Sequence, residues 1–168
     1  SPGISLKQEG ISYLAALELP AVIVNMCRGG PGLGNIAPAQ SDYFQATRGG
    51  GHGDYRNIVL APSSCQELAE LTMEAFDLAD TYRIPVIILA DGMLGQMMEP
   101  VEFPDHKNPK KLSPKDWALT GAKGRPGRVI RSLILDPVLE EEHNWKLMRK
   151  YERIQKKEVR YETFLLGD

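Results

Sequence analysis

The chain has 168 residues, of which 42% are hydrophobic and 25% are charged, and its formal net charge is −2 at pH 7. These values are typical of one globular domain, with or without an appendage. The lack of a basic excess gives no indication of nucleic acid or of an acidic membrane surface as partner. The apolar runs reach about six residues, which is too short to cross a bilayer.

Two residue types limit the metal chemistry and suggest the compartment. Cys27 and Cys65 fit no metal-binding spacing, and a reducing cytoplasm is the default compartment for such a chain. The three histidines, His52, His106 and His143, are too scattered for a metal triad. The sequence therefore predicts a cytoplasmic protein without a metal site of its own.

The chain opens with a turn, a helix and a strand. It begins Ser1-Pro2-Gly3 without an initiator Met, which predicts an N-terminally incomplete fragment. Residues 4–19 are expected to form a helix, and Ser5 with Gln8 is compatible with a capping box. Residues 21–26 (AVIVNM) predict a strand buried on both faces, as in a parallel sheet.

A Gly-rich loop, residues 28–54, follows this strand and carries Arg28, Arg48 and His52. Ligands of open α/β sheets bind at the carboxyl ends of strands, and loops this long are commonly functional. A flexible surface loop is equally compatible with the composition. Residues 41–47 predict a short helix capped by Ser41 or Asp42.

The next segments continue the alternation of strands and helices. Residues 57–61 and 86–90 predict two more apolar strands. Between them, Pro62-Ser63-Ser64 begins a helix with an apolar stripe and an acidic face that we expect to be solvated. The predicted fold class is α/β, a parallel sheet with flanking helices.

The character of the chain changes after Glu99. Prolines punctuate a polar extension, residues 128–136 (RVIRSLILD) could form a further strand, and residues 140–158 predict a polar helix. That helix is either solvated or a subunit contact. We therefore expect a partial domain at residues 1–99 and, at residues 100–168, a Pro-rich extension with a C-terminal helix.

Several common motifs are absent or favour structural roles. There is no P-loop, no G-x-G-x-x-G and no nucleophile elbow. Asp91-Gly92 could bind Mg²⁺ or phosphate, but a turn is the favoured interpretation. Cys27 beside Arg28 could be reactive, but a buried, inert thiol is favoured. Arg48 can present a bidentate fork to a carboxylate, although a solvated loop Arg is the alternative.

The sequence resembles the 2-oxoacid:ferredoxin oxidoreductases nearly continuously over residues 1–99. The GGPGLGN form of the loop looks closest to the branched-chain, 2-oxoisovalerate type. The extension continues the resemblance through residues 117–121 and 142–144. The matching segments are Ser1–Leu6, 19–25, 28–36, 40–46, 51–54, 60–64, 83–86 and Asp91-Gly92.

The resemblance implies a fold, a reaction and a set of partners. The fold would be part of the thiamine diphosphate-binding, pyrimidine-side domain. The reaction would be oxidative decarboxylation of a 2-oxoacid, with transfer of the acyl group to coenzyme A and of electrons to ferredoxin. A partner subunit would share the thiamine diphosphate and its Mg²⁺, because Ala90-Asp91-Gly92 lacks the first Gly of the diphosphate-side signature. The iron–sulfur cluster would lie on an iron–sulfur subunit or on ferredoxin.

The resemblance also assigns residues. Arg48 would bind the substrate carboxylate. The active-site loop and cofactor contacts would come from Gly3, Arg28, Gly30, Pro31 and His52.

The activating Glu of the family lies upstream of Ser1, so no catalytic residue is expected in this fragment and it should be inactive alone. The alternatives are a non-catalytic α/β scaffold module of a multi-subunit complex and, more weakly, a nucleotide-binding Rossmann-type domain.

Overall fold

A computed structural model describes residues 1–103 and 114–163, and the chain divides into two compact units, Ser1–Ser132 and Leu133–Asp168. The first unit contains a parallel sheet of three strands in the order β1-β3-β2. The strands are β1 (Ala21–Cys27), β2 (Ile58–Leu60) and β3 (Pro85–Asp91). The sheet confirms the predicted α/β class and the three predicted strands.

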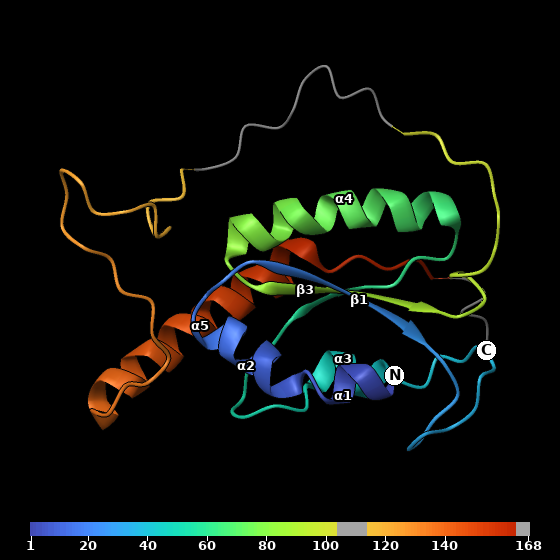
Figure 1. Cartoon of the computed structure of the whole chain (residues 1–168), viewed down its shortest axis with the longest axis horizontal. Helices are drawn as coiled ribbons and strands as arrows, with labels where there is room; N and C mark the ends of the chain where they lie inside the picture. The colour runs from blue at the N-terminus through green and yellow to red at the C-terminus, as the bar shows by residue number, and fades with distance from the viewer. Residues whose placement is uncertain (104–113, 164–168) are drawn as a thin grey trace. The chain divides into compact units, whose positions relative to one another are not determined.

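The core of the first unit is built around β3. Val86 and Ile88 are fully buried, because β3 has a strand on each side and helices over both faces. The helix α4 (Cys65–Tyr82) covers one face of the sheet (Figure 1). Three shorter helices lie on the other face: α1 (Pro2–Ser5), α2 (Gln8–Ala16) and α3 (Tyr43–Arg48).

The strand β1 departs from its predicted burial on both faces. The side chains of Val24 and Met26 are 49% and 38% exposed, whereas Asn25 and Cys27 are buried. The prediction is wrong for Val24 and Met26, because β1 is an edge strand of the sheet and its neighbours only partly cover these two side chains.

The predicted N-terminal helix is divided into α1 and α2 at Leu6-Lys7. The capping box expected from Ser5 and Gln8 does not form. The Ser5 hydroxyl instead accepts a hydrogen bond from Gln45 Nε2 at 2.9 Å. Gln8 is buried, and its Oε1 accepts from the Tyr55 hydroxyl at 3.0 Å. Both polar side chains thus bond to residues more than thirty positions away, which a local capping pattern does not reveal.

The predicted strand at residues 128–136 does not form, because no described strand lies beside it to complete a ladder. Its last residue, Asp136, instead caps α5 (Pro137–Glu158), where its Oδ1 accepts hydrogen bonds from the backbone amides of Val138 and Leu139. The predicted C-terminal helix is confirmed and begins three residues earlier than expected. Pro104, Pro109 and His106 lie outside the described residues.

None of the helices described in either unit combines the length and apolarity needed to cross a membrane. The predicted division into residues 1–99 and 100–168 stays a prediction.

The start of α4 generates a stability prediction. The Ser64 hydroxyl accepts from the backbone amide of Glu67 at 3.1 Å, and Glu67 Oε2 accepts from the Ser63 amide at 2.6 Å. Substitution Ser64→Ala leaves the Glu67 amide without this acceptor, so we expect the free energy of unfolding to fall by about 1 kcal/mol. Urea denaturation followed by circular dichroism measures the change. The matched control Ser132→Ala lies outside any cap and should leave the midpoint unchanged.

Candidate functional site at the carboxyl end of β1

A groove of about 350 Å³ lies where β1 runs into the Gly-rich loop. The carboxyl ends of parallel strands and the loops that leave them are the usual place for ligands in such sheets. The walls come from Ser1, Pro2 and Ser5, from residues 28–32, and from Ser41, Asp42 and Gln45.

The groove brings together several residues that the sequence analysis selected. Arg28, Gly30 and Pro31 line it directly. Gly3 lines an adjoining groove of about 530 Å³ beside β1, which shares Ser1, Pro2 and Arg28 with the first one.

Arg48 and His52 lie elsewhere on the loop. The guanidinium carbon of Arg48 stands 4.3 Å from the centroid of the Phe44 ring, a cation–π contact on the exposed side of α3. His52 is exposed. Neither side chain lines the two grooves described above, and their predicted roles stay predictions.

A part-buried polar network connects the wall of the groove to β1, and its residues were not among the predicted site residues. Asn25 Nδ2 donates to Asp42 Oδ2 at 2.9 Å, and the Ser1 hydroxyl donates to the same oxygen at 3.3 Å. The Ser1 amino group lies 2.8 Å from Asp42 Oδ2 and 2.6 Å from Asn25 Oδ1. One feature of the sequence could have predicted this network. Asn25 is a lone amide in an apolar strand, and a buried amide requires hydrogen-bond partners.

This network sets the charge states around it. Burial raises the pKa of Asp42, and the hydrogen bond that Asn25 donates to its carboxylate lowers it. Burial raises the pKa of the Cys27 thiol, and the nearby Asp42 carboxylate adds to that effect. Cys27 is only 1% exposed, so the predicted burial of the thiol is confirmed, and its inertness stays a prediction.

Hydrogen bonds hold the Arg28 backbone in place, and one nitrogen of its side chain has no partner among the described residues. Its amide donates to the Ser1 hydroxyl at 2.8 Å, and its carbonyl accepts from the Ser41 hydroxyl at 2.7 Å. In the side chain, Nη2 donates to the Leu33 carbonyl at 2.9 Å. The Nε atom is buried and has no partner among the described residues. A buried guanidinium N–H without an acceptor is costly, and an acceptor could reach Nε only after a movement of the side chain.

The loop after Arg28 closes on itself. The Gly29 amide donates to the Ala37 carbonyl, the Asn35 amide donates to the Gly29 carbonyl, and both distances are 2.9 Å. Gly34 has φ +60°, and a Cβ there would stand 1.6 Å from the Gly29 carbonyl oxygen. Only glycine fits at position 34, so the Gly-rich sequence is required by a tight loop that places Arg28 and Gly30 in the groove.

The second glycine cluster has a structural explanation. The amides of Gly50 and Gly51 donate to the Tyr55 hydroxyl at 3.2 and 3.1 Å, and that hydroxyl donates to buried Gln8. The cluster therefore anchors the end of the loop to α2.

The Asp91-Gly92 pair forms the favoured turn. Asp91 Oδ1 accepts from the amides of Met93 and Leu94, each at 2.9 Å. Within the described residues, no group of three or more His, Cys, Asp or Glu side chains is arranged to hold a metal ion.

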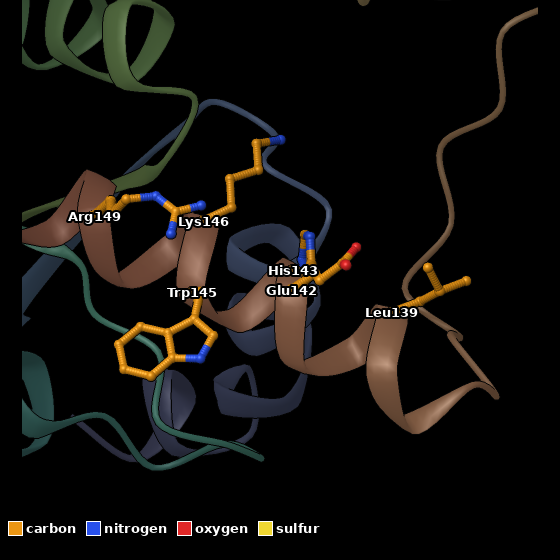
Figure 2. A pocket seen from close by; sticks show the side chains of 6 residues that line it. All are labelled: Leu139, Glu142, His143, Trp145, Lys146 and Arg149. Carbon is orange, nitrogen blue, oxygen red and sulfur yellow. The ribbon is translucent and has the colours of Figure 1, made fainter.

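A second pocket belongs to the other unit and contains none of the predicted site residues. It is an open hollow of about 540 Å³ lined by side chains of α5 (Figure 2). The lining residues are Leu139, Glu142, His143, Trp145, Lys146 and Arg149.

The loop geometry predicts different effects for two neighbouring glycines. Gly34→Ala forces a Cβ into the Gly29 carbonyl, whereas Gly32→Ala, at φ +69°, meets nothing within 4 Å. We expect Gly32→Ala to cost about 1 kcal/mol of backbone strain, and Gly34→Ala to cost clearly more. Urea denaturation of the two variants side by side checks this, and equal midpoints would contradict the closed loop.

The Cys27 thiol gives a pH prediction. The pKa of Cys27 in the folded chain lies above the ordinary 9.0, because burial favours the protonated thiol. The stability that the protonated thiol contributes is therefore complete below pH 9 and is lost as the pH rises through the folded pKa. In a Cys65→Ser variant, we expect slow reaction of Cys27 with a disulfide reagent at pH 8 and rapid reaction after denaturation. A native rate equal to that of the denatured chain would contradict the burial.

Comparison with known proteins supports one family over nearly the whole chain. Residues 1–163 match the family described as "Pyruvate flavodoxin/ferredoxin oxidoreductase, thiamine diP-bdg". The chain is 56% identical, over 99% of its length, to the ketoisovalerate oxidoreductase subunit VorB of Methanothermobacter thermautotrophicus. It is 48% identical, over 66% of its length, to the 2-oxoglutarate synthase subunit KorA of the same organism.

A solved structure is also similar. A 2-oxoglutarate:ferredoxin oxidoreductase from Magnetococcus marinus, with 2-oxoglutarate, coenzyme A and succinyl-CoA bound, matches the whole chain with a TM-score of 0.74 and 25% identity. The chain covers 34% of that protein chain, 47% of VorB and 29% of KorA. The match over residues 1–163 and the identity to VorB lead to one conclusion: the chain belongs to the thiamine diphosphate-binding family of the pyruvate flavodoxin/ferredoxin oxidoreductases.

Proposed function

We propose that the chain is part of a subunit of a thiamine diphosphate-dependent 2-oxoacid:ferredoxin oxidoreductase that acts on 2-oxoisovalerate or another branched-chain 2-oxoacid. The observation that carries the proposal is the 56% identity to a ketoisovalerate oxidoreductase subunit over 99% of the chain. The 2-oxoglutarate synthase subunit matches only 66% of the chain, at 48% identity, which favours the branched-chain substrate.

The groove supports a role in binding the acid. A 2-oxoacid presents a carboxylate beside a keto oxygen, and a guanidinium is the side chain best suited to such a planar anion. Arg28 lines the groove, and its Nε has no hydrogen-bond partner among the described residues. Arg48, the residue that the resemblance selects, stacks on Phe44 outside the groove. We therefore propose Arg28 as the first candidate for the substrate carboxylate and retain Arg48 as the second.

The same groove fits one edge of a shared cofactor site. Gly30 and Pro31 present backbone to it without large side chains, and Gly3 lines the adjoining groove. When bound, thiamine diphosphate supplies the carbanion chemistry that separates CO₂ from a 2-oxoacid. The residues of this chain would bind and orient the acid beside it. His52 is retained as a loop residue that could approach the site in the assembled enzyme.

Other parts of the enzyme are assigned to partners. We propose that a partner subunit holds the diphosphate and Mg²⁺, and that an iron–sulfur subunit or ferredoxin accepts the electrons. Coenzyme A would receive the acyl group. The chain spans 47% of VorB, so the residues of the longer relatives that lie outside the match can supply the remaining catalytic groups. We propose a cytoplasmic location for the complex.

The function is tested with the full-length subunit assembled with its partners. We expect reduction of a viologen dye that requires a 2-oxoacid, coenzyme A and thiamine diphosphate, with 2-oxoisovalerate preferred over 2-oxoglutarate. A complex that reduces the dye without thiamine diphosphate would contradict the proposed chemistry. Complete inactivity with every 2-oxoacid would favour the scaffold module instead.

Substitution of each arginine in the assembled complex distinguishes the proposed roles of Arg28 and Arg48. Arg28→Ala should lower kcat/KM for the 2-oxoacid by about 2–4 kcal/mol, roughly 30- to 700-fold, as expected for loss of a charged hydrogen-bonded pair. Arg48→Ala should have a small effect if its role is the contact with Phe44. Steady-state kinetics measures both. Exposed Arg131→Ala is the matched control, and a large effect of Arg48→Ala with none of Arg28→Ala would reverse the assignment.

A further inference from the structure

We propose that Asp42 is a positioning residue that acts through the Ser1 hydroxyl to fix the backbone of Arg28 at the groove. The inference rests on the proposed role of Arg28, and it adds a residue that the sequence analysis expected only to cap a helix. Asp42 makes no side-chain hydrogen bond to the start of α3, although it occupies the cap position.

The relay has a defined direction. The Ser1 hydroxyl has one proton, and it donates that proton to Asp42 Oδ2 at 3.3 Å. Its oxygen lone pairs are then turned toward the Arg28 amide, which donates to Ser1 Oγ at 2.8 Å. The carboxylate thus orients the hydroxyl as an acceptor, and the hydroxyl holds the peptide N–H that precedes the arginine side chain.

The relay is itself anchored to the sheet. Asn25 is 5% exposed on β1, and its Nδ2 donates to Asp42 Oδ2 at 2.9 Å. On the other side of the peptide, the Ser41 hydroxyl donates to the Arg28 carbonyl at 2.7 Å. The Arg28 backbone is therefore fixed at its N–H by the Ser1 side chain and at its C=O by the Ser41 side chain.

This arrangement matters because of the position of Arg28. It stands one residue beyond β1, where the ladder with β3 has ended and the Gly-rich loop begins. Errors of about 1 Å in the placement of a binding group can cost on the order of 100-fold in rate. Loss of the relay should therefore weaken binding of the 2-oxoacid carboxylate by displacing Arg28.

The kinetic test uses the full-length subunit in its assembled complex. Asp42→Ala should raise KM for the 2-oxoacid by roughly 10-fold, the effect of losing a buried acceptor, while kcat changes by less than about 2-fold. A variant that only lowers the folded fraction would instead lower the apparent kcat at an unchanged KM. An unchanged KM for Asp42→Ala, with Arg28→Ala impaired, would overturn the relay.

Conservative and paired variants sharpen the test. Asp42→Asn keeps an amide oxygen that can accept from Ser1, so its KM should return to within roughly 3-fold of wild type. An Asp42→Asn variant whose KM is raised as much as that of Asp42→Ala would overturn the relay.

The double variant Ser1→Ala with Asp42→Ala should raise KM no more than either change alone, because both substitutions break the same chain of hydrogen bonds. Additive effects on KM would contradict the relay. Exposed Asp116→Asn is the matched control.

A structural readout separates this inference from the proposed function. Hydrogen exchange of the Arg28 amide should be roughly 10-fold faster in Asp42→Ala than in wild type, because its acceptor is no longer oriented. Unchanged exchange would overturn the relay whatever the kinetics. Faster exchange together with an Arg28→Ala variant of normal kcat/KM would retain the relay and reject the carboxylate role of Arg28.

Discussion

The architecture of the first unit follows from the burial of β3 between two parallel neighbours. A strand must be apolar where both its edges and both its faces are covered, and Val86 and Ile88 meet that requirement. Parallel pairing also brings the ends of β1 and β3 to the same edge of the sheet. The Gly92 amide donates to the Cys27 carbonyl at 3.0 Å, which joins the two ends where the groove begins.

The segment that runs from β1 into the Gly-rich loop must be apolar at its start and polar at its end. Strand β1 must be apolar where it packs on the helices, as Ile23 does, yet the segment that leaves it must carry a charged side chain and a tight loop. The buried amide of Asn25 joins these parts, because it cannot remain buried without partners and its partners are Asp42 and Ser1. The polarity at the base of the groove is thus a packing requirement as well as a chemical one.

The sequence could predict what is set by local periodicity and by glycine chemistry. The three strands, α4, the polar C-terminal helix and the place of the Gly-rich loop follow from such patterns, and the family resemblance is confirmed over residues 1–163. Features set by bonds between distant residues were not predictable. The hydrogen bonds of Asp42 to Asn25 and Ser1 span 17 and 41 positions, and the link from Gln45 to Ser5 spans 40. A cap position at Asp42 looks the same in sequence whether its carboxylate serves the helix or the sheet.

The outer side of β1 has a consequence for handling the protein. Its seven residues form a strand edge that no described strand pairs, with Val24 and Met26 exposed beside it. Neither proline nor lysine interrupts this edge, so it lacks the usual protection against edge-to-edge association. An unpaired and partly apolar strand edge of this kind is a template on which two copies of the chain can associate edge to edge.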